Sequence, residues 1–349
     1  MATPQKILLV QLRQLGDIIL TTPSLRELKK SWPDATIDFL CHPMGRLILA
    51  DNPYLNQIIT YDEKSKWLDQ LRFLKRLRAE SYDLVLDFMY NPRSALYSYF
   101  TGAPHRLAFP SRRQTFFTDI VKQSLEVEYI VKEKFRYLEH LGLKPQDMVL
   151  DLPWNESHMK PLQEFLIQEL QFESAPLRVA ISPTHRRAER QWPIERYAEI
   201  ADRLVLEKKA SVVWVWGPGE EEFVLNAIKL CRQPMIMAPK TSFRELAAFL
   251  ANCDFFLGNS NGPSHVAVSN TLSSLQLHGN TFAKAWCPLT ILHRAVQAGA
   301  NLPEGRGPIG LIHSGELWHA LEAMWPFVER VAEKRRSFGI KSNWTQRII

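Results

Sequence analysis

A carboxylate follows the first apolar run of the chain, at a position where ligands often bind. The run Ile7 to Val10 has the composition of a buried strand, and Gly16 and Asp17 open a segment whose apolar residues have helical spacing. In open α/β sheets, junctions of this kind lie at the carboxyl ends of the strands, where ligands collect. Asp17 is therefore a candidate functional residue. The alternative is that it only caps the helix, because a carboxylate there accepts backbone N–H groups and suits the helix dipole.

Three turns in the second half of the chain also lie between a predicted strand and a predicted helix. The first follows the run 177–182 and holds a threonine and four basic residues: Thr184, His185, Arg186, Arg187 and Arg190. Cationic side chains beside a helix amino terminus could hold a phosphate. A solvated basic loop without function is the alternative interpretation.

The other two turns offer hydrogen-bonding groups of different kinds. The turn GPGEEEF brings Glu220 to a helix start, where its carboxylate could accept hydrogen bonds from a ribose diol or cap the helix. The turn GNSNGPSHVA supplies glycine, amide, hydroxyl and imidazole groups: Gly258, Asn259, Ser260, Asn261, Gly262 and His265. Glycine permits close approach of a ligand, and free backbone N–H groups at a helix start could bind a phosphate.

Several common nucleotide motifs are missing from the sequence. It has no G-x-G-x-x-G fingerprint and no G-x-x-x-x-G-K-[ST] loop, so neither dinucleotide binding nor ATP hydrolysis is favoured. It also has no D-x-D, the usual acidic means of holding a divalent metal on a nucleotide sugar. Arginine and helix dipoles are then left to balance a diphosphate. We therefore expect no metal site and no cofactor.

Composition favours a globular protein of two domains. The chain has 349 residues, of which 46% are hydrophobic and 23% charged. No apolar run approaches the roughly 18 residues that span a bilayer. The amino terminus has no signal-peptide layout, so we expect a cytoplasmic protein. The four cysteines are scattered, without metal-ligand spacing.

The net charge of +6 is compatible with several anionic partners. Nucleic acid, an anionic membrane surface and a phosphate-bearing substrate would all suit it. The combination of aromatic and basic residues typical of an RNA-binding module is missing, so we expect no nucleic-acid partner. Arg106, Arg112 and Arg113 lie around one turn, which could be a solvated loop or could meet an anionic acceptor.

Strand-like and helix-like segments alternate along the whole chain, a pattern typical of parallel sheets. In the first half we predict strands at 7–10, 36–41, 57–60 and 83–88, with helices at 67–79 and 133–141. In the second half we predict strands at 177–182, 211–216, 234–237, 254–257 and 273–278, with helices at 194–207, 220–230 and 243–251. Segment 144–154 is the predicted linker. An apolar stripe in 315–336 predicts a last helix, which Pro326 should kink.

Three ordered motifs give the chain a resemblance to a known family. LRQLGDIILTTPSLRELK, RQWPIERYAEIADRL and GNSNGPSHVA with LHGNT resemble glycosyltransferase family 9, the ADP-heptose:lipopolysaccharide heptosyltransferases. The resemblance implies an α/β, GT-B type fold, with two Rossmann-like domains whose parallel sheets face across a cleft. We place an acceptor domain at 1–155 and a nucleotide-sugar domain at 174–325. We expect a helix in 326–349 that packs back on the first domain.

The resemblance also implies roles for individual residues. The aspartate of the family's G-D pair, a general base toward the acceptor hydroxyl, falls on Asp17. The basic residue before W-P, usually a lysine that faces the diphosphate, falls on Arg190. Glu220 falls on the ribose-binding acid. The remaining predicted donor contacts are Thr184, His185, Arg186, Lys240, Thr241, Ser260, Asn261, Gly262 and His265, and the predicted acceptor contacts are Arg13, Arg112 and Arg113.

Ser260 departs from the family pattern, which has an aspartate thought to hold the hydroxyls of the donor sugar. A serine offers one hydroxyl in place of a charged acceptor, whose hydrogen bonds contribute roughly 1.5 to 3 kcal/mol. Either the donor sugar differs or the donor is bound more weakly.

The sequence as a whole predicts an inverting, metal-independent transfer of a heptose or related sugar. The predicted partners are an ADP-sugar donor and an anionic glycolipid acceptor such as a lipopolysaccharide core, with peripheral contact at the inner face of the membrane as a further expectation. Two alternatives remain open at this stage. One is a glycosyltransferase that uses a different nucleotide sugar, and the other is a catalytically idle two-domain binding protein.

Overall fold

The chain folds into two compact units, each built around one parallel sheet. The computed structural model describes residues 3–169 and 177–338. The first unit covers Met1–Asp151 and the second covers Leu152–Ile349. The division between the units falls inside the predicted linker 144–154. The first part of this segment belongs to the first unit, where Asp151 forms an ion pair with Arg26. None of the helices in the described ranges is both long and apolar enough to cross a bilayer.

The first unit has a six-stranded parallel sheet with the order β3-β2-β1-β4-β5-β6. Its strands are β1 (Lys6–Val10), β2 (Thr36–Cys41), β3 (Gln57–Thr60), β4 (Leu84–Asp87), β5 (His105–Ala108) and β6 (Asp119–Ile120). The central strand β1 pairs with β2 through Leu8 and Asp38, and with β4 through Leu8 and Val85. Burial on both faces explains why β1 reads as a continuous apolar run.

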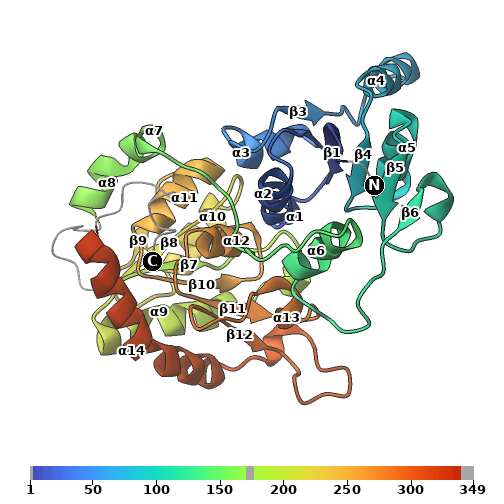
Figure 1. Cartoon of the computed structure of the whole chain (residues 1–349). Helices are drawn as coiled ribbons and strands as arrows, with labels where there is room; N and C mark the ends of the chain where they lie inside the picture. The colour runs from blue at the N-terminus through green and yellow to red at the C-terminus, as the bar shows by residue number, and fades with distance from the viewer. Residues whose placement is uncertain (1–2, 170–176, 339–349) are drawn as a thin grey trace. The chain divides into compact units, whose positions relative to one another are not determined.

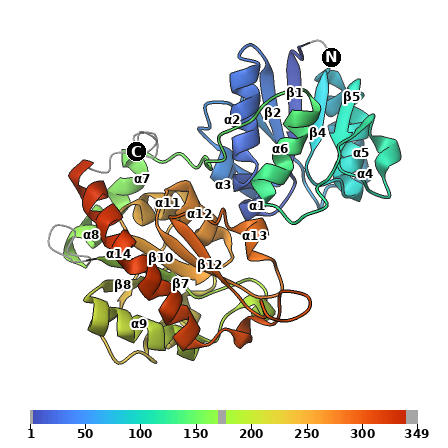
Figure 2. The same cartoon turned by 60° about the horizontal axis from the view of Figure 1, so that its bottom comes forward.

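Helices cover both faces of this sheet (Figures 1 and 2). They are α1 (Leu15–Ile19), α2 (Thr22–Ser31), α3 (Arg46–Leu49), α4 (Trp67–Ala79), α5 (Pro92–Thr101) and α6 (Ile130–His140). The pair α2 and α6 packs together on one face, and α4 and α5 pack together on the other. The segment predicted as one helix after Gly16 is divided into α1 and α2, with Leu20 ending the first.

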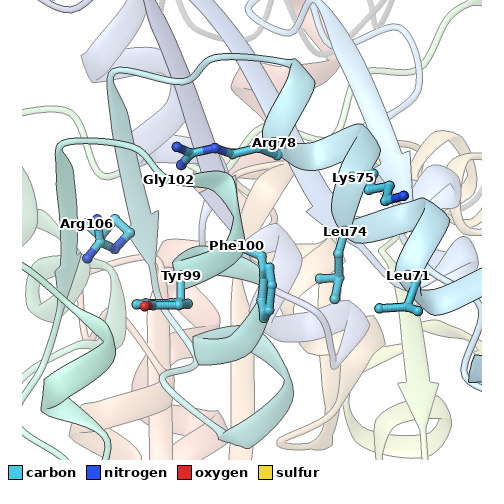
Figure 3. A pocket seen from close by; sticks show the side chains of 8 residues that line it. All are labelled: Leu71, Leu74, Lys75, Arg78, Tyr99, Phe100, Gly102 and Arg106. Carbon is cyan, nitrogen blue, oxygen red and sulfur yellow. The ribbon is translucent and has the colours of Figure 1, made fainter.

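Local sequence explains the bounds of α5. Asn91 caps its amino end by accepting hydrogen bonds from the backbone N–H groups of Arg93 and Ser94, and Pro92 occupies the first turn. Gly102 ends the helix in the left-handed region, with φ +64°. Near this end, α4 and α5 enclose an open pocket of about 600 Å³ (Figure 3).

The second unit repeats the architecture with the order β12-β11-β10-β7-β8-β9, again all parallel. Its strands are β7 (Arg178–Ser182), β8 (Ser211–Trp214), β9 (Ile236–Met237), β10 (Phe255–Asn259), β11 (Ser274–His278) and β12 (His293–Gln297). Its helices are α7 (Glu156–Met159), α8 (Gln163–Gln168), α9 (Ile194–Lys208), α10 (Glu221–Ile228), α11 (Phe243–Ala251), α12 (Gly262–Ser269), α13 (Ala283–Trp286) and α14 (Ser314–Phe338). In chain order both sheets have the Rossmann arrangement 3-2-1-4-5-6.

The last helix, α14, covers the predicted stripe 315–336 almost residue for residue and continues through Pro326. Leu317, Leu321 and Val328 are buried in the core of the second unit, and the Arg335 guanidinium donates hydrogen bonds to backbone carbonyls of Ala251 and Cys253. The described part of the helix therefore packs on the second unit. Residues 339–349 lie outside the described residues, and packing of this end on the first domain stays a prediction.

Three buried histidines of the second unit lie on β11, β12 and α12. Burial lowers the pKa of His278 to about 3 and the pKa values of His293 and His265 to about 4. The Oγ of Ser274 and the Nδ1 of His293 are 2.9 Å apart, whereas neither ring nitrogen of His278 has a hydrogen-bond partner among the described residues. All three rings are therefore neutral at pH 7, and folding opposes their protonation.

We expect the second unit to lose stability in mild acid. Below the ordinary histidine value near 6.5 the unfolded chain binds protons that the folded chain does not bind until about pH 4, so the free energy of unfolding falls as the pH falls. For His293 alone the loss between pH 6.5 and 5 is about 1 to 2 kcal/mol. Urea denaturation at a series of pH values measures this slope. His293→Gln should flatten it and the exposed His319→Gln should not; equal slopes in both variants would contradict the assignment.

Candidate active site

In each sheet the order of the strands reverses at one point, and the candidate residues lie there. In the first sheet the chain passes from β1 to β2 on one side and from β4 to β5 on the other. In the second sheet β7 and β10 have the same relation. Loops that leave such a pair of strands diverge, so a crevice remains at their carboxyl ends, where doubly wound sheets bind ligands.

Asp17 lies in the first turn of α1, directly after the loop that leaves β1. Its Oδ2 accepts a hydrogen bond of 3.1 Å from the backbone N–H of Gln14, and the side chain is half-buried. The capping role considered from the sequence is therefore present in the structure. A carboxylate can accept several hydrogen bonds, so capping through Oδ2 leaves Asp17 able to take a proton from a ligand.

A buried lysine from α6 holds the loop and the helix that carry Asp17. Lys134 is 4% exposed, and its Nζ donates hydrogen bonds to the Gln11 side chain, to the backbone carbonyl of Asp17 at 3.0 Å, and to the Thr21 hydroxyl. Burial lowers the pKa of Lys134 to about 8, and the negative charge of Asp17 opposes this shift. Lys134 therefore fixes the backbone at Asp17 from the protein interior and also places a cation near the carboxylate.

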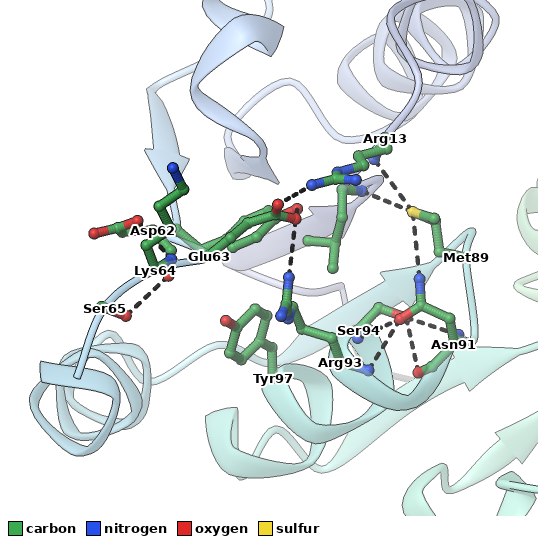
Figure 4. A network of polar contacts seen from close by, with 12 residues as sticks. Arg13, Asp62, Glu63, Lys64, Ser65, Met89, Asn91, Arg93, Ser94 and Tyr97 are labelled. Carbon is green, nitrogen blue, oxygen red and sulfur yellow. Dashed lines mark hydrogen bonds and ion pairs between the residues drawn. The ribbon is translucent and has the colours of Figure 1, made fainter. Parts of the chain in front are cut away.

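Arg13 lies in the same loop, but its charge is already paired. Its guanidinium forms an ion pair with Glu63, which follows β3. The Glu63 carboxylate forms a second ion pair with Arg93 at 2.9 Å (Figure 4). The Tyr61 hydroxyl donates to the same carboxylate at 3.1 Å. An anionic acceptor that bound Arg13 would have to compete with Glu63. The other predicted acceptor contacts, exposed Arg112 and half-buried Arg113, follow β5 at the same edge of the sheet.

In the second unit, a hydrogen bond joins the turns after β7 and β8. The Thr184 hydroxyl donates to Oε2 of Glu220 at 2.7 Å, and the same oxygen accepts the backbone N–H of Gly217 at 2.8 Å. Glu220 also precedes α10 as its N-cap residue. The carboxylate is thus held at the carboxyl edge of the sheet, as the sequence predicted from the turn GPGEEEF.

Asn259, the last residue of β10, and Asn261, just after the strand, connect this end of β10 to the loop after β7. Asn259 Nδ2 donates to the Pro183 carbonyl at 2.7 Å, and Asn261 Nδ2 donates to the Thr184 carbonyl at 2.9 Å. Oδ1 of Asn261 meanwhile accepts the Ser264 backbone N–H and caps α12. Gly258 makes this approach possible, because a Cβ there would lie 2.8 Å from the backbone oxygen of Ser182. The two loops of the switch point are therefore fixed to one another.

The basic residues after β7 repel one another. Burial and then the charge of Arg187 lower the pKa of Arg190, and burial and then the charge of Arg190 lower the pKa of His185. His185 is thus neutral at pH 7 and forms a hydrogen bond with the Ser260 backbone. Among the described residues, Arg186 and Arg190 form no ion pair within 4.0 Å of a carboxylate. A cluster of cations such as this one attracts an anion.

Comparison with known proteins identifies the family. The model of glycosyltransferase family 9 (heptosyltransferase) matches residues 70–305. The chain belongs to glycosyltransferase family 9. Lipopolysaccharide heptosyltransferase 3 of Escherichia coli K12 is 26% identical over 295 residues, covering 80% of this chain and 84% of that protein. Lipopolysaccharide heptosyltransferase 1 of Campylobacter coli is 26% identical over 310 residues, covering 85% of this chain and 90% of that protein.

Solved structures agree on the fold of this glycosyltransferase. A family 9 glycosyl transferase from Veillonella parvula has a TM-score of 0.78 at 21% identity and covers 92% of this chain and 97% of its own. The E. coli ADP-heptose lps heptosyltransferase II has a TM-score of 0.72 at 19% identity, covering 91% of this chain and 98% of its own. The predicted α/β class with two Rossmann-like domains of the GT-B type is confirmed.

The remaining predicted donor residues of the glycosyltransferase differ in their surroundings. Exposed Lys240 and half-buried Thr241 follow β9, at the same edge as Glu220. His265 is only 4% exposed and its ring lies against Trp286, with centroids 6.3 Å apart. His265 therefore supports α12 from inside, and direct contact with a donor stays a prediction for it. Groups of three or more His, Cys, Asp or Glu side chains able to hold a metal do not occur in the described ranges.

Sequence reasoning missed Lys134 and the bridging role of Asn259. Lys134 lies in the segment IVKEKFRYLEH. Lys132 in the same segment has similar neighbouring residues in the sequence, but it is exposed and forms an ion pair with Glu128. The helical pattern did carry a signal, because Lys134 lies on the stripe of buried residues formed by Val131, Phe135 and Leu138. A lysine on the apolar face of a helix indicates a buried partner.

We expect Lys134→Met to reduce turnover by about 10- to 100-fold, because three buried acceptors lose their donor and the backbone at Asp17 is released. Loops of the second unit keep their own hydrogen bonds, so affinity for the nucleotide should change by less than about twofold. Steady-state kinetics and nucleotide titration separate the two effects. Lys132→Met, on the exposed side of the same helix, is the matched control; equal losses in both variants would refute a specific role for Lys134.

Proposed function

We propose that this glycosyltransferase transfers a heptose from an ADP-activated donor to a lipopolysaccharide-core or similar glycan acceptor, with inversion at the anomeric carbon and without a metal ion. The observation that carries the proposal is the hydrogen-bonded set of Thr184, Glu220 and Asn261 at the switch point of the second sheet. Relatives named as lipopolysaccharide heptosyltransferases support the substrate class. A structural neighbour, the E. coli heptosyltransferase WaaC, carries ADP-2-deoxy-2-fluoro heptose.

In the proposed reaction Asp17 is the general base. Its carboxylate takes the proton of the acceptor hydroxyl, and the oxygen attacks the anomeric carbon of the heptose. The bond from that carbon to the diphosphate breaks, and ADP leaves with the electron pair. A single displacement of this kind inverts the anomeric configuration. Lys134 contributes by positioning Asp17 through its backbone carbonyl.

The second unit balances the charge of the leaving diphosphate. Arg186 and Arg190 provide positive charge that nearby carboxylates do not neutralise, and the neutral His185 ring can donate a hydrogen bond. The turn at Asn261 and Gly262 opens α12, whose first backbone N–H groups suit a phosphate oxygen. Glu220 accepts from the ribose hydroxyls, and Lys240 and Thr241 lie beside the adenine. A fixed set of donors stabilises charge as it develops in the transition state.

Release of nucleotide from a panel of sugar nucleotides tests this function. With a lipopolysaccharide-core acceptor, we expect ADP from ADP-heptose, an inverted anomer in the product spectrum by NMR, and unchanged rates in EDTA. Binding of ADP without turnover of any donor would favour the idle binding protein. Because the proposed acceptor is a glycolipid, the proposed place of action is the cytoplasm beside the inner membrane.

Ser260 favours a second candidate, a glycosyltransferase with a different nucleotide sugar. Its backbone N–H donates to the Leu277 carbonyl at 3.1 Å, which fixes a half-buried serine where the family usually has an aspartate. A donor sugar with fewer hydroxyls, or with negative charge at that position, would suit the serine better. Faster nucleotide release from another sugar nucleotide than from ADP-heptose would establish this alternative.

We expect Asp17→Asn to lower turnover by about two to four powers of ten, with nucleotide affinity nearly unchanged. The amide keeps the shape of the side chain and one oxygen for the Gln14 N–H, but it cannot accept the proton. Thermal unfolding of the same variant controls for the loss of the helix cap. Intact turnover in a folded variant would remove Asp17 as the base and leave capping as its role.

We expect Arg190→Ala to lower the affinity for ADP by about tenfold, while the affinity for adenosine stays nearly constant. The substitution removes a proposed diphosphate contact and no base contact. Calorimetric titration with both ligands, with and without EDTA, makes the comparison. Arg232→Ala, at an exposed residue before the amino end of β9 on the opposite edge of the same sheet, is the control variant. Parallel losses of ADP and adenosine, or a strict need for magnesium, would place the diphosphate elsewhere.

A further inference from the structure

The apolar stripe of α4 is only half covered by the protein. Leu74 and Leu77 pack into the core of the first unit at 7% and 0% exposure. Earlier in the same helix, Trp67 is 69%, Leu68 is 49% and Leu71 is 45% exposed. A helix that only needed to bury its face on the sheet would carry polar residues at these outer positions. The exposed half of the stripe therefore faces something other than the core.

The neighbouring helix α5 extends this apolar surface. Leu96, Tyr99 and Phe100 are 38%, 50% and 41% exposed on it. Figure 3 shows Leu71, Leu74 and Phe100 side by side where the two helices meet. The pocket of about 600 Å³ between the helices is lined by these residues together with Tyr99 and Gly102 and by three cations: Lys75, Arg78 and Arg106. We call the exposed surface of both helices the α4–α5 face.

Cationic side chains surround the apolar part of this face. Helix α4 carries four basic residues, Arg72, Lys75, Arg76 and Arg78, against a single acid, Asp69. Asp69 pairs with Arg72 at 2.7 Å and leaves the other three in excess. Arg78 lies across Gly102, where a Cβ would be only 0.8 Å from its Nη1, so the glycine keeps the space that the guanidinium occupies. The pocket is thus apolar inside and basic around its rim.

We propose that the α4–α5 face docks on the surface of an anionic phospholipid bilayer. An amphipathic helix with a tryptophan and leucines on one side and lysines and arginines beside them has the composition that inserts at the headgroup level. Trp67 and Tyr99 have amphipathic rings that suit the interface, and cations near the surface are attracted to anionic lipids. A neutral surface would not need a cationic rim around an apolar centre.

The face extends from one edge of the first sheet to the other. Gly102 and Arg106 lie at the amino end of β5, the edge opposite to the one that carries Asp17, whereas Trp67 opens α4 after the loop that leaves the carboxyl end of β3. The proposed reaction uses none of the residues named in this face. The proposal rests on exposure and charge alone and does not depend on the identity of the donor.

Vesicle co-sedimentation tests the proposal with the full-length protein. We expect binding to vesicles of phosphatidylcholine with phosphatidylglycerol, weak binding to phosphatidylcholine alone, and release by salt. Leu68→Ser with Leu71→Ser, and separately Arg72→Glu with Lys75→Glu, should each lower the partition coefficient by about tenfold. The matched controls are exposed residues of the second unit: Leu206→Ser with Leu225→Ser, and Lys229→Glu with Arg232→Glu, which should bind as the wild type does.

Three results would overturn the proposal. The first is wild-type vesicle binding by both α4 double variants, once their thermal unfolding shows that they are folded. The second is equal binding to neutral vesicles without salt dependence. The third is a dimer in size-exclusion chromatography that only the leucine variant dissociates, since the face would then join two copies of the chain. Turnover of a water-soluble, lipid-free acceptor should be the same in wild type and variants, so failure of docking is distinguishable from failure of the proposed chemistry.

Discussion

Both candidate sites depend on one constraint, the reversal of strand order in a parallel sheet. Right-handed connections carry the chain from β1 toward β2 and from β4 toward β5, so the loops after β1 and β4 leave in opposite directions. No helix covers the space between such loops. In this chain Asp17 and Asn261 each lie just after a strand of the two reversing pairs, at the start of a helix. Their chemistry comes from side chains, but their common location comes from the topology.

Loops that diverge at a switch point lose the backbone partners that a sheet would give them. Their carbonyls must find other donors, because a buried polar group without a partner is costly. Here side chains supply these donors: Lys134 reaches the Asp17 carbonyl, Asn259 the Pro183 carbonyl and Asn261 the Thr184 carbonyl. Each of them comes from a segment distant in sequence. The loops are therefore fixed by tertiary contacts, which preorganises the groups they carry.

This origin of the site explains what the sequence could and could not predict. Apolar runs identified β1, β2 and α4, because burial on a sheet imposes a simple period on the residues. The strands β5, β6 and β12 were missed, since HRLA, DI and HRAVQ are short and contain charged residues that lie near the edges of the sheets. Turns with unusual composition revealed Thr184 and Glu220, which the structure joins by a hydrogen bond. Lys134 was missed because its composition and neighbours are like those of Lys132, and only its place on the buried stripe of α6 distinguishes it.

The carboxyl edges of the two sheets differ in how far their arginines are already paired with carboxylates, and this affects how well each edge could bind an anion. Arg13 is neutralised by Glu63, which also holds Arg93, so an anion bound there replaces an existing ion pair and gains little. The turn after β7 is different, because burial and the charge of Arg187 depress the pKa of Arg190. Repulsion between like charges costs free energy in the protein without a ligand, and binding of a dianion would relieve this repulsion. These charges suit the role proposed for the turn after β7, which is to bind the diphosphate. At the carboxyl edge of the first sheet, Arg13 and Arg93 are paired with Glu63, and Asp17 is the carboxylate proposed to take the proton.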